Sequence, residues 1–208
     1  MSEQFSFPGF GDLPVPVPVT TEKDKAKAKT IGEHAPYSLF FSIFPAPSDA
    51  VEITRFASAL LQAQGLTGKP LLPHRLHVTL HDLGNFAELP QDLVDSALKA
   101  GGALASNAFD VAFDRALSYP SSGTYVLSGG EGARELTAFR EELGEAMKGQ
   151  GLRVRRNFTP HMTLVYDKHA VAEHAIEPVR WTASEFVLIK SHRGKGIYDL
   201  LGRWPLTA

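Results

Sequence analysis

The 208-residue sequence predicts an α+β fold of two pseudo-symmetric lobes, each an antiparallel sheet with helices on the outside, around a central cleft. Three observations support this prediction. Strand-like and helix-like segments follow one another in an order that suits two sheets. The pattern H-x-T-L occurs twice, once in each half, at His77–Leu80 and His161–Leu164. The chain is also long enough for two small lobes that share an interface.

The composition narrows the class of protein. Hydrophobic residues make up 43% of the chain and charged residues 21%, as in ordinary globular proteins. The formal net charge of −2 gives no overall attraction to nucleic acid, so RNA recognition would require a local basic patch. The chain has no cysteine, which excludes disulfides and thiolate catalysis. It has no apolar run of the length needed to span a membrane, and its N-terminus lacks a basic stretch followed by an apolar one, so we expect no secretory signal. We expect a soluble, cytoplasmic monomer.

The N-terminal residues 1–35 are predicted to be a disordered tail, outside a single domain at 36–208. The alternating prolines of Pro14–Pro18 favour an extended polyproline conformation over a sheet. Residues 22–29 are highly charged and have nothing to bury. The tail is therefore not expected to contribute to the core.

The first half of the domain is predicted to contain the first motif strand. Residues 37–44 form a β-rich run ended by Pro45. Ser48 or Asp49 can cap a helix that ends at Gly65. The motif strand itself is expected at about 75–81, closed by a turn at 84–85.

The second half is predicted to repeat this alternation of helix and strand. The expected helices are 90–100 and 131–148, both with apolar residues at spacings of three and four. The expected strands are 109–114, 125–127, 161–166, 185–191 and 196–201.

Strand alternation gives each motif a chemical face. In an extended strand His77 and Thr79 point to one side, and so do His161 and Thr163, while the intervening residues point into a core. With 8 histidines in the chain, only about 0.05 copies of the pattern are expected by chance. Two such strands facing one another would enclose a site with two imidazoles and two hydroxyls.

These residue types suit a phosphoryl reaction without a metal. One neutral imidazole can accept a proton and a second, protonated one can donate a proton, because the pKa of histidine lies near neutrality. The two threonine hydroxyls can donate to phosphate oxygens. A zinc site at His77, His81 and His161 is an alternative, but threonine is a poor zinc ligand and Asp82 falls on the opposite strand face. We expect no metal and no cofactor.

The motifs and their flanking residues resemble a known family. The H-x-T-L pair resembles the 2H phosphoesterase superfamily. Residues 156–164, Arg-Asn-Phe-Thr-Pro-His-Met-Thr-Leu, resemble the R-x-F-x-P-H-x-T-L signature of its RNA 2′,3′-cyclic phosphodiesterase or 2′-5′ RNA ligase (LigT-like) branch. Residues 76–84 resemble the first-motif signature, and 186–206 are similar to the closing strands. Two positions depart from the pattern: an aromatic residue often follows the first motif where Asp82 stands, and 165–167 lack the basic residue that often follows the second.

The resemblance implies hydrolysis of 2′,3′-cyclic phosphates on RNA ends or nucleotides. It implies His77 and His161 as the acid–base pair, Thr79 and Thr163 as phosphate ligands, and reverse 2′-5′ ligation as a side reaction. Further candidates for substrate contact are Arg156, His81, Tyr37, Phe41 and Tyr198. The alternatives are another small cyclic phosphate, such as ADP-ribose 1″,2″-cyclic phosphate, and a non-catalytic protein that binds RNA ends.

Overall fold

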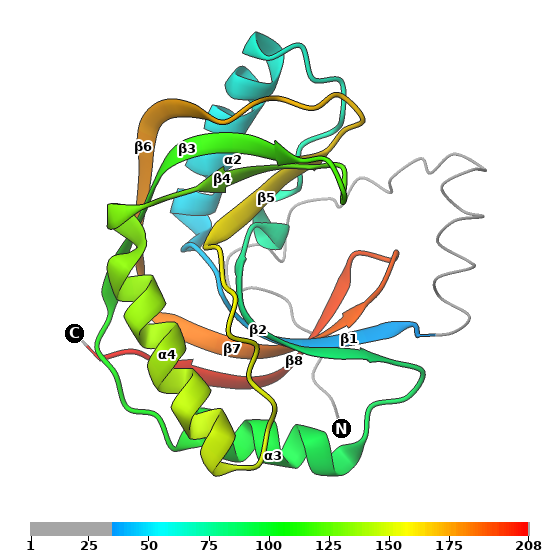
Figure 1. The fold of residues 1–208 in the computed structure, drawn as a ribbon, viewed down its shortest axis with the longest axis vertical. Helices are drawn as coiled ribbons and strands as arrows, with labels where there is room; N and C mark the ends of the chain where they lie inside the picture. Colours follow the sequence, from blue (N-terminus) through cyan, green and yellow to red (C-terminus); the bar gives the residue numbers. More distant parts are fainter. Residues whose placement is uncertain (1–34, 208) are drawn as a thin grey trace.

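Two four-stranded antiparallel sheets form the frame of the protein. The computed structural model describes residues 35–207. The first sheet has the order β2-β1-β7-β8 and the second the order β5-β4-β3-β6. The bounds in the first sheet are β2 (Val78–Phe86), β1 (Tyr37–Ile43), β7 (Glu185–His192) and β8 (Ile197–Pro205). Those in the second are β5 (His161–Tyr166), β4 (Thr124–Ser128), β3 (Phe109–Tyr119) and β6 (His174–Ala183). Figure 1 shows the second sheet above the first, with the strand edges β5 and β2 turned toward each other.

In residues 35–207, three α-helices lie on the outer sides of the sheets. They are α2 (Pro47–Ala63), α3 (Gln91–Gly102) and α4 (Arg134–Gly149), and short 3₁₀ turns occupy Pro73–Arg75 and Glu131–Ala133. Helix α2 covers the second sheet and α3 lies under the first, while α4 runs along the side that joins the two lobes (Figure 1). None of the helices in the described part of the chain is long and apolar enough to cross a membrane.

Helices α2 and α4 end in the same way. Each is followed by the tripeptide Gln-Gly-Leu, at 64–66 and at 150–152. The glycines Gly65 and Gly151 have φ values of 66° and 75°, and the next residue's N–H donates to the carbonyl five residues earlier in both cases. This is the Schellman arrangement, which favours glycine because of the left-handed backbone. The two helices therefore occupy equivalent places ahead of the two motif strands.

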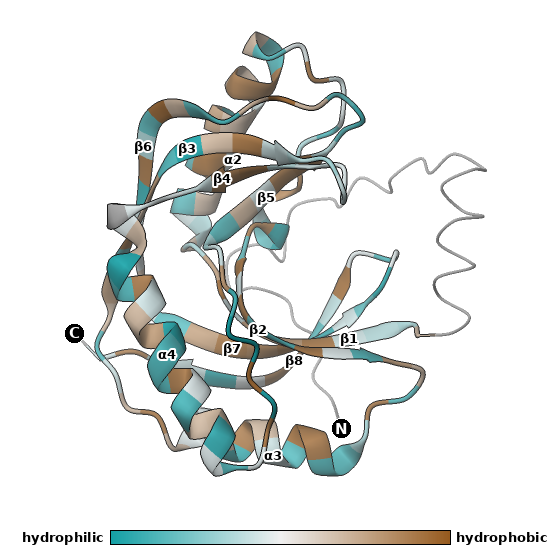
Figure 2. Cartoon of the chain, viewed as in Figure 1, coloured by the Kyte–Doolittle hydropathy of each residue, from teal (hydrophilic) through white to brown (hydrophobic). Residues whose placement is uncertain are grey.

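The core is continuous through both lobes. It contains the apolar sides of both sheets and the inner sides of the helices, and Figure 2 shows both hydrophilic and hydrophobic stretches on α4, as expected for a helix with one packed side. A second, smaller cluster lies on the other side of the first sheet and consists of Phe40, Phe44, Val187 and Ile189. The first sheet is therefore apolar on both sides.

The predicted fold class is confirmed, with two local corrections. Strand β2 continues through the expected turn at 84–85 to Phe86, because Gly84 adopts a φ of 125° inside the strand. Strand β6 was not predicted, since Pro178 and the charges around it disturb its alternation; it is an edge strand, where proline is tolerated. The predicted tail falls outside the described residues, apart from Ala35.

Two neighbouring glycines at the end of α3 give a matched test of core packing. A Cβ on Gly101 would clash with the ring of Trp204, which stacks on Phe186. A Cβ on Gly102 would lie 3.8 Å from the same ring, an ordinary contact. We expect Gly101→Ala to lower the free energy of unfolding in urea by about 1–3 kcal/mol. Gly102→Ala should change it little or raise it, and equal losses in both variants would contradict this account.

Candidate active site

The two motif histidines are held by the same local hydrogen bond. His77 precedes β2 and His161 begins β5, and each of these strands is the edge of its sheet. The Nδ1 of His77 donates to the carbonyl oxygen of Arg75 at 2.7 Å, and the Nδ1 of His161 donates to that of Thr159 at 2.8 Å. In the neutral ring, Nε2 is then the nitrogen that can accept a proton. Both imidazoles are half-buried and carry the same tautomer.

A β-bulge at the leucine of each motif sets which later residues share the histidine's side of the strand. Between β1 and β2 the register skips Leu80, and between β4 and β5 it skips Leu164. A bulge inserts one residue and so reverses the alternation beyond it. The motifs thus keep His and Thr on one face of the sheet, and the residue five places after the histidine joins them.

Each bulge has a donor for the carbonyl that it displaces from the ladder. The Leu80 carbonyl accepts a hydrogen bond of 3.0 Å from Nε of Arg140, and the Leu164 carbonyl accepts one of 2.7 Å from the backbone N–H of Leu71. An unpaired buried carbonyl would destabilise the fold by about 1–3 kcal/mol. Both motif strands therefore bulge at the same residue and are secured there.

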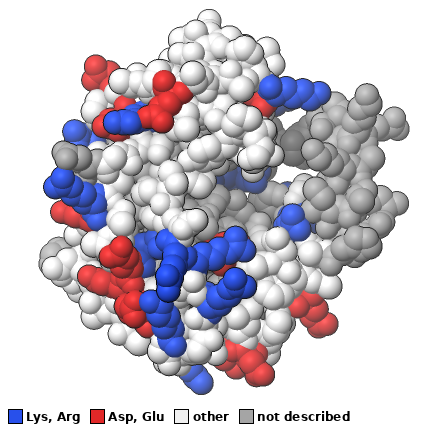
Figure 3. Space-filling model, viewed as in Figure 1, with Lys and Arg blue, Asp and Glu red and all other residues white. Residues whose placement is uncertain are grey.

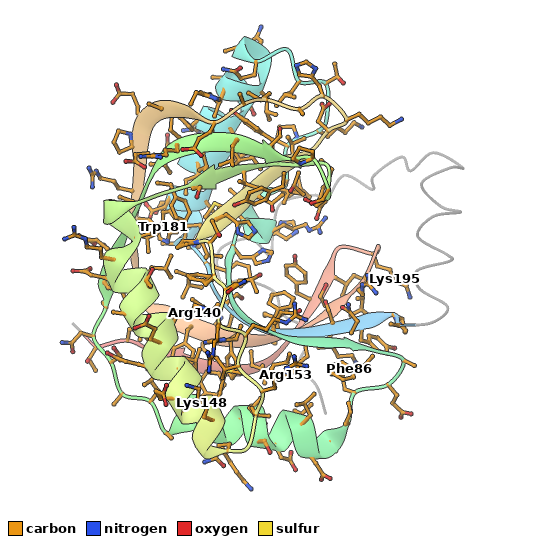
Figure 4. The ribbon with its side chains drawn as sticks, viewed as in Figure 1. Phe86, Arg140, Lys148, Arg153, Trp181 and Lys195 are labelled. Carbon is orange, nitrogen blue, oxygen red and sulfur yellow. The ribbon has the colours of Figure 1, made fainter. Side chains whose placement is uncertain are left out.

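Arg140 connects α4 to the site. It is 6% exposed, and beside its bond to Leu80 its Nη2 donates to the carbonyl oxygen of Arg155 at 2.5 Å. Its guanidinium lies 4.5 Å from the centre of the Phe158 ring, a cation–π contact. Figure 4 shows Arg140 between α4 and β2. This one side chain fixes the first motif strand against the segment that leads to the second.

Around His161 the structure has a cavity of about 370 Å³. Its lining includes Thr79 from the first motif, Asp82, Tyr119, Arg155 and His161. The Tyr119 ring meets His161 edge-on, with 5.4 Å between the ring centres. The lining therefore joins the threonine of the first motif to the histidine of the second, whereas His77 and Thr163 are not part of it.

Around His77 the environment is aromatic. Phe40 and Phe44 lie against the imidazole with ring centres 5.5 and 5.4 Å away, and Tyr198 meets it edge-on at 5.7 Å. The pKa of His77 is lowered to about 4, chiefly because burial penalises the charged ring. The hydrogen bond to Arg75 acts in the opposite direction, and the charges of Arg75 and His161 lower the pKa further. His77 is therefore neutral at pH 7 and lies close enough to His161 for their charges to interact.

Basic side chains gather beside the cavity that His161 lines. Figure 3 shows Lys and Arg concentrated on the face over α4 and the segment after it, where Figure 4 labels Arg140, Lys148 and Arg153. A second cavity of about 740 Å³ is lined there by Lys148, Arg155 and Arg156 among others. Acidic residues of α4, such as Glu145, line it as well. The patch is thus of mixed charge with a basic rim.

Five residues were predicted as further substrate contacts, and the structure brings only some of them to the site. Tyr198 lies against His77. Arg156 is exposed and lines the larger cavity, whereas its neighbour Arg155 lines the cavity of His161 and pairs with Asp82 at 3.1 Å.

The structure places four residues differently from the prediction. Phe41 is fully buried against Phe186 and Trp204, so Phe40 takes the place at the histidine. Tyr37 lies on the same side of β1 as Phe41 and contacts Lys190. The bulge at Leu80 removes His81 from the His77 face, but His81 still lines the cavity of His161. The bulge also places Asp82 on that face, contrary to the sequence prediction, because Asp82 pairs with Phe40.

Sequence reasoning missed several residues that form the site. Tyr119 comes from β3, two strands away from β5, and no motif marks it. Arg140 resembles any charged residue of an amphipathic helix. The repeated leucine of the motifs could have suggested equivalent bulges. Among the described residues, no group of three His, Asp or Glu side chains is arranged to hold a metal ion.

Comparison with solved structures identifies the class of proteins that share this fold. The chain is similar to a structure described as a phosphoesterase, with 26% identity and a TM-score of 0.65 over 83% of this chain and 100% of the other. It is similar to E. coli LigT bound to NADP⁺, with 25% identity and a TM-score of 0.64 over 83% and 99% of the two chains. LigT bound to ATP gives 26% identity and a TM-score of 0.63 over the same shares. The fold is that of the LigT-like phosphoesterases.

The family follows from the sequence model. The model of the 2′-5′ RNA ligase superfamily matches residues 45–195, so the chain belongs to this superfamily of 2H phosphoesterases. A search of curated proteins finds no match. Membership supports an enzyme that acts on phosphate esters, and both motifs lie inside the matched region.

His81 gives a test of the buried network through the pH dependence of stability. Its Nε2 donates to the Arg140 carbonyl at 2.8 Å, and its pKa is lowered to about 4, first by burial and then by the Arg140 charge, against the hydrogen bond. The unfolded chain binds this proton near pH 6.5 and the folded chain only near pH 4, so the free energy of unfolding falls as pH decreases through that window.

We expect His81→Gln to reduce the stability lost between pH 7 and pH 5 by about 2 kcal/mol relative to the wild type. Urea unfolding at both pH values measures this difference. His77 lowers the free energy of unfolding by a similar amount in both proteins as the pH falls, so its contribution cancels in the difference between them. Identical losses in variant and wild type would show that His81 is protonated equally in the folded and unfolded states.

Proposed function

We propose that the protein hydrolyses 2′,3′-cyclic phosphates of RNA ends or nucleotides by metal-independent acid–base catalysis. The observation that carries this proposal is the matched pair of imidazoles, each held by its Nδ1 to the carbonyl two residues earlier. This arrangement presents two proton-transferring nitrogens with the same tautomer. The nucleotides NADP⁺ and ATP found in LigT structures are consistent with a nucleotide substrate.

In the proposed mechanism His77 is the base. The neutral Nε2 of His77 accepts a proton from water as the water oxygen forms a bond to phosphorus. The bond from phosphorus to one ribose oxygen breaks, and protonated His161 gives its proton to that oxygen. The hydroxyls of Thr79 and Thr163 donate to the non-bridging oxygens and hold the phosphate in line. The product is a linear phosphate monoester. If a ribose 5′-hydroxyl attacks the phosphorus in place of water and the bond to the 3′-oxygen breaks, with the proton passed to that oxygen, the product is a 2′-5′ linkage, which is the reverse of the cleavage of such a linkage.

A second candidate substrate is a small cyclic phosphate such as ADP-ribose 1″,2″-cyclic phosphate. The NADP⁺ complex of LigT favours it, because that ligand is a dinucleotide joined by a pyrophosphate. A non-catalytic protein that binds RNA ends has no use for two differently protonated imidazoles. Turnover of a panel of cyclic phosphates separates these candidates.

Replacing either histidine tests the reaction. We expect His77→Ala and His161→Ala each to lower kcat on 2′,3′-cyclic AMP by about 10²- to 10⁴-fold, the usual effect of removing a general acid or base. Phosphorus NMR measures the product. EDTA should leave the wild-type rate unchanged. Full activity in both variants would exclude the two-histidine mechanism.

A substrate with a better leaving group tests which histidine is the acid. Catechol cyclic phosphate releases a phenol, whose pKa of about 10 is far below that of a ribose hydroxyl, so its departure needs little protonation. We expect His161→Ala to lose much less activity on this substrate than on cyclic AMP. His77→Ala should lose a comparable factor on both, and the opposite pattern would exchange the two roles.

A further inference from the structure

The residue five places after each motif histidine turns onto the same side of its sheet as the histidine. On β4, residues 124, 126 and 128 alternate on one side, and they pair with Tyr166, Thr163 and His161. On β1, Phe40 contacts His77 and pairs with Asp82. The equivalent positions of the two motifs therefore hold Tyr166 and Asp82, and both face the site.

Asp82 of the first motif lies beside the histidine of the second motif. Asp82 and His161 line the same cavity of about 370 Å³. Tyr166 holds the place in the second motif that Asp82 holds in the first, so the equivalence of the two motifs puts it toward His77, where Tyr198 meets the imidazole edge-on. The rise in the pKa of Tyr198 is due first to burial, is opposed by Arg75, and is increased by the neighbouring Tyr166 phenol. The site consequently has the Asp82–Arg155 ion pair at the His161 end, where Tyr119 is the ring against the imidazole, and three aromatic rings around the imidazole at the His77 end.

The exposure of Tyr166 distinguishes it from the other aromatic residues at this end. Phe40 and Phe44 are both 8% exposed and pack under His77. Tyr166 is 61% exposed, more than Leu72 and Ile197, which at 38% and 39% are the other large hydrophobic residues exposed within the described part of the chain. An exposed aromatic ring beside a phosphate site has the chemistry needed to stack a nucleobase, because every base presents a π-face.

We propose that Tyr166 stacks on the nucleobase of the substrate and that this base lies at the His77 end of the site. The inference rests on the proposed function and adds the position of the base. At the opposite end, Asp82 is paired with Arg155 at 3.1 Å and offers no ring to a base. The remaining part of an RNA chain then passes the His161 end, where Arg155 lines the cavity.

The experiment compares two substrates that differ only in the base. One is 2′,3′-cyclic AMP, and the other is methyl β-ribofuranoside 2,3-cyclic phosphate, which has the same cyclic phosphate and no base. We expect Tyr166→Ala to lower kcat/KM for cyclic AMP by about 10- to 100-fold, mainly through KM, the usual effect of losing one stacked base. Its kcat/KM for the base-free substrate should equal that of the wild type.

Two further variants complete the test. Tyr166→Phe should keep cyclic AMP turnover within about threefold of the wild type, since stacking needs the ring and not the hydroxyl. Tyr37→Ala, an aromatic residue on the opposite side of the first sheet, should behave as the wild type on both substrates. An equal loss on both substrates in Tyr166→Ala, or no loss on either, overturns the stacking role. If the wild type hydrolyses neither substrate, the proposed function itself is overturned.

Discussion

The bulge at the leucine of each H-x-T-L motif is the constraint on which the site depends. In each motif the histidine and the threonine face the cleft, and the leucine and the residue after it are buried. Beyond the bulge, the residue five places after the histidine faces the cleft again. The structure provides a separate donor for each displaced carbonyl, Arg140 for Leu80 and the Leu71 N–H for Leu164. Without those donors a regular ladder would be favoured, and Asp82 and Tyr166 would turn to the core.

Much of the fold could be predicted from the sequence because its elements obey simple periodicities. The motif strands and all three helices follow from alternation, helical spacing and terminal glycines. Strand β6 could not be predicted because Pro178 breaks the pattern and only its edge position makes it tolerable. The duplicated Gln-Gly-Leu was visible in the sequence, yet its meaning required the structure, which shows both copies in the same helix ending.

The candidate site was predictable only as far as the alternation held. His77 with Thr79 and His161 with Thr163 precede the bulges, so their shared faces follow directly from strand geometry. His81 and Asp82 follow the bulge at Leu80, so each lies on the side of the strand opposite to the predicted one. Phe40 and Phe41 could not be distinguished, because a strand apolar on both sides shows no alternation. Arg140 was inaccessible to sequence reasoning, since a buried arginine on an amphipathic helix has the same pattern as an exposed one.

A two-histidine reaction needs two like groups to do opposite jobs, and here the backbone does not distinguish them. Both imidazoles have the same tautomer, the same hydrogen bond and the same place at a strand edge. The side chains around them break this symmetry. Phe40, Phe44 and Tyr198 remove His77 from water and keep it neutral at pH 7. The charges of Asp82 and Arg155 lie at the other end, with His161. In the proposed mechanism the direction of proton transfer is therefore set by packing around one histidine, in a frame that is otherwise duplicated.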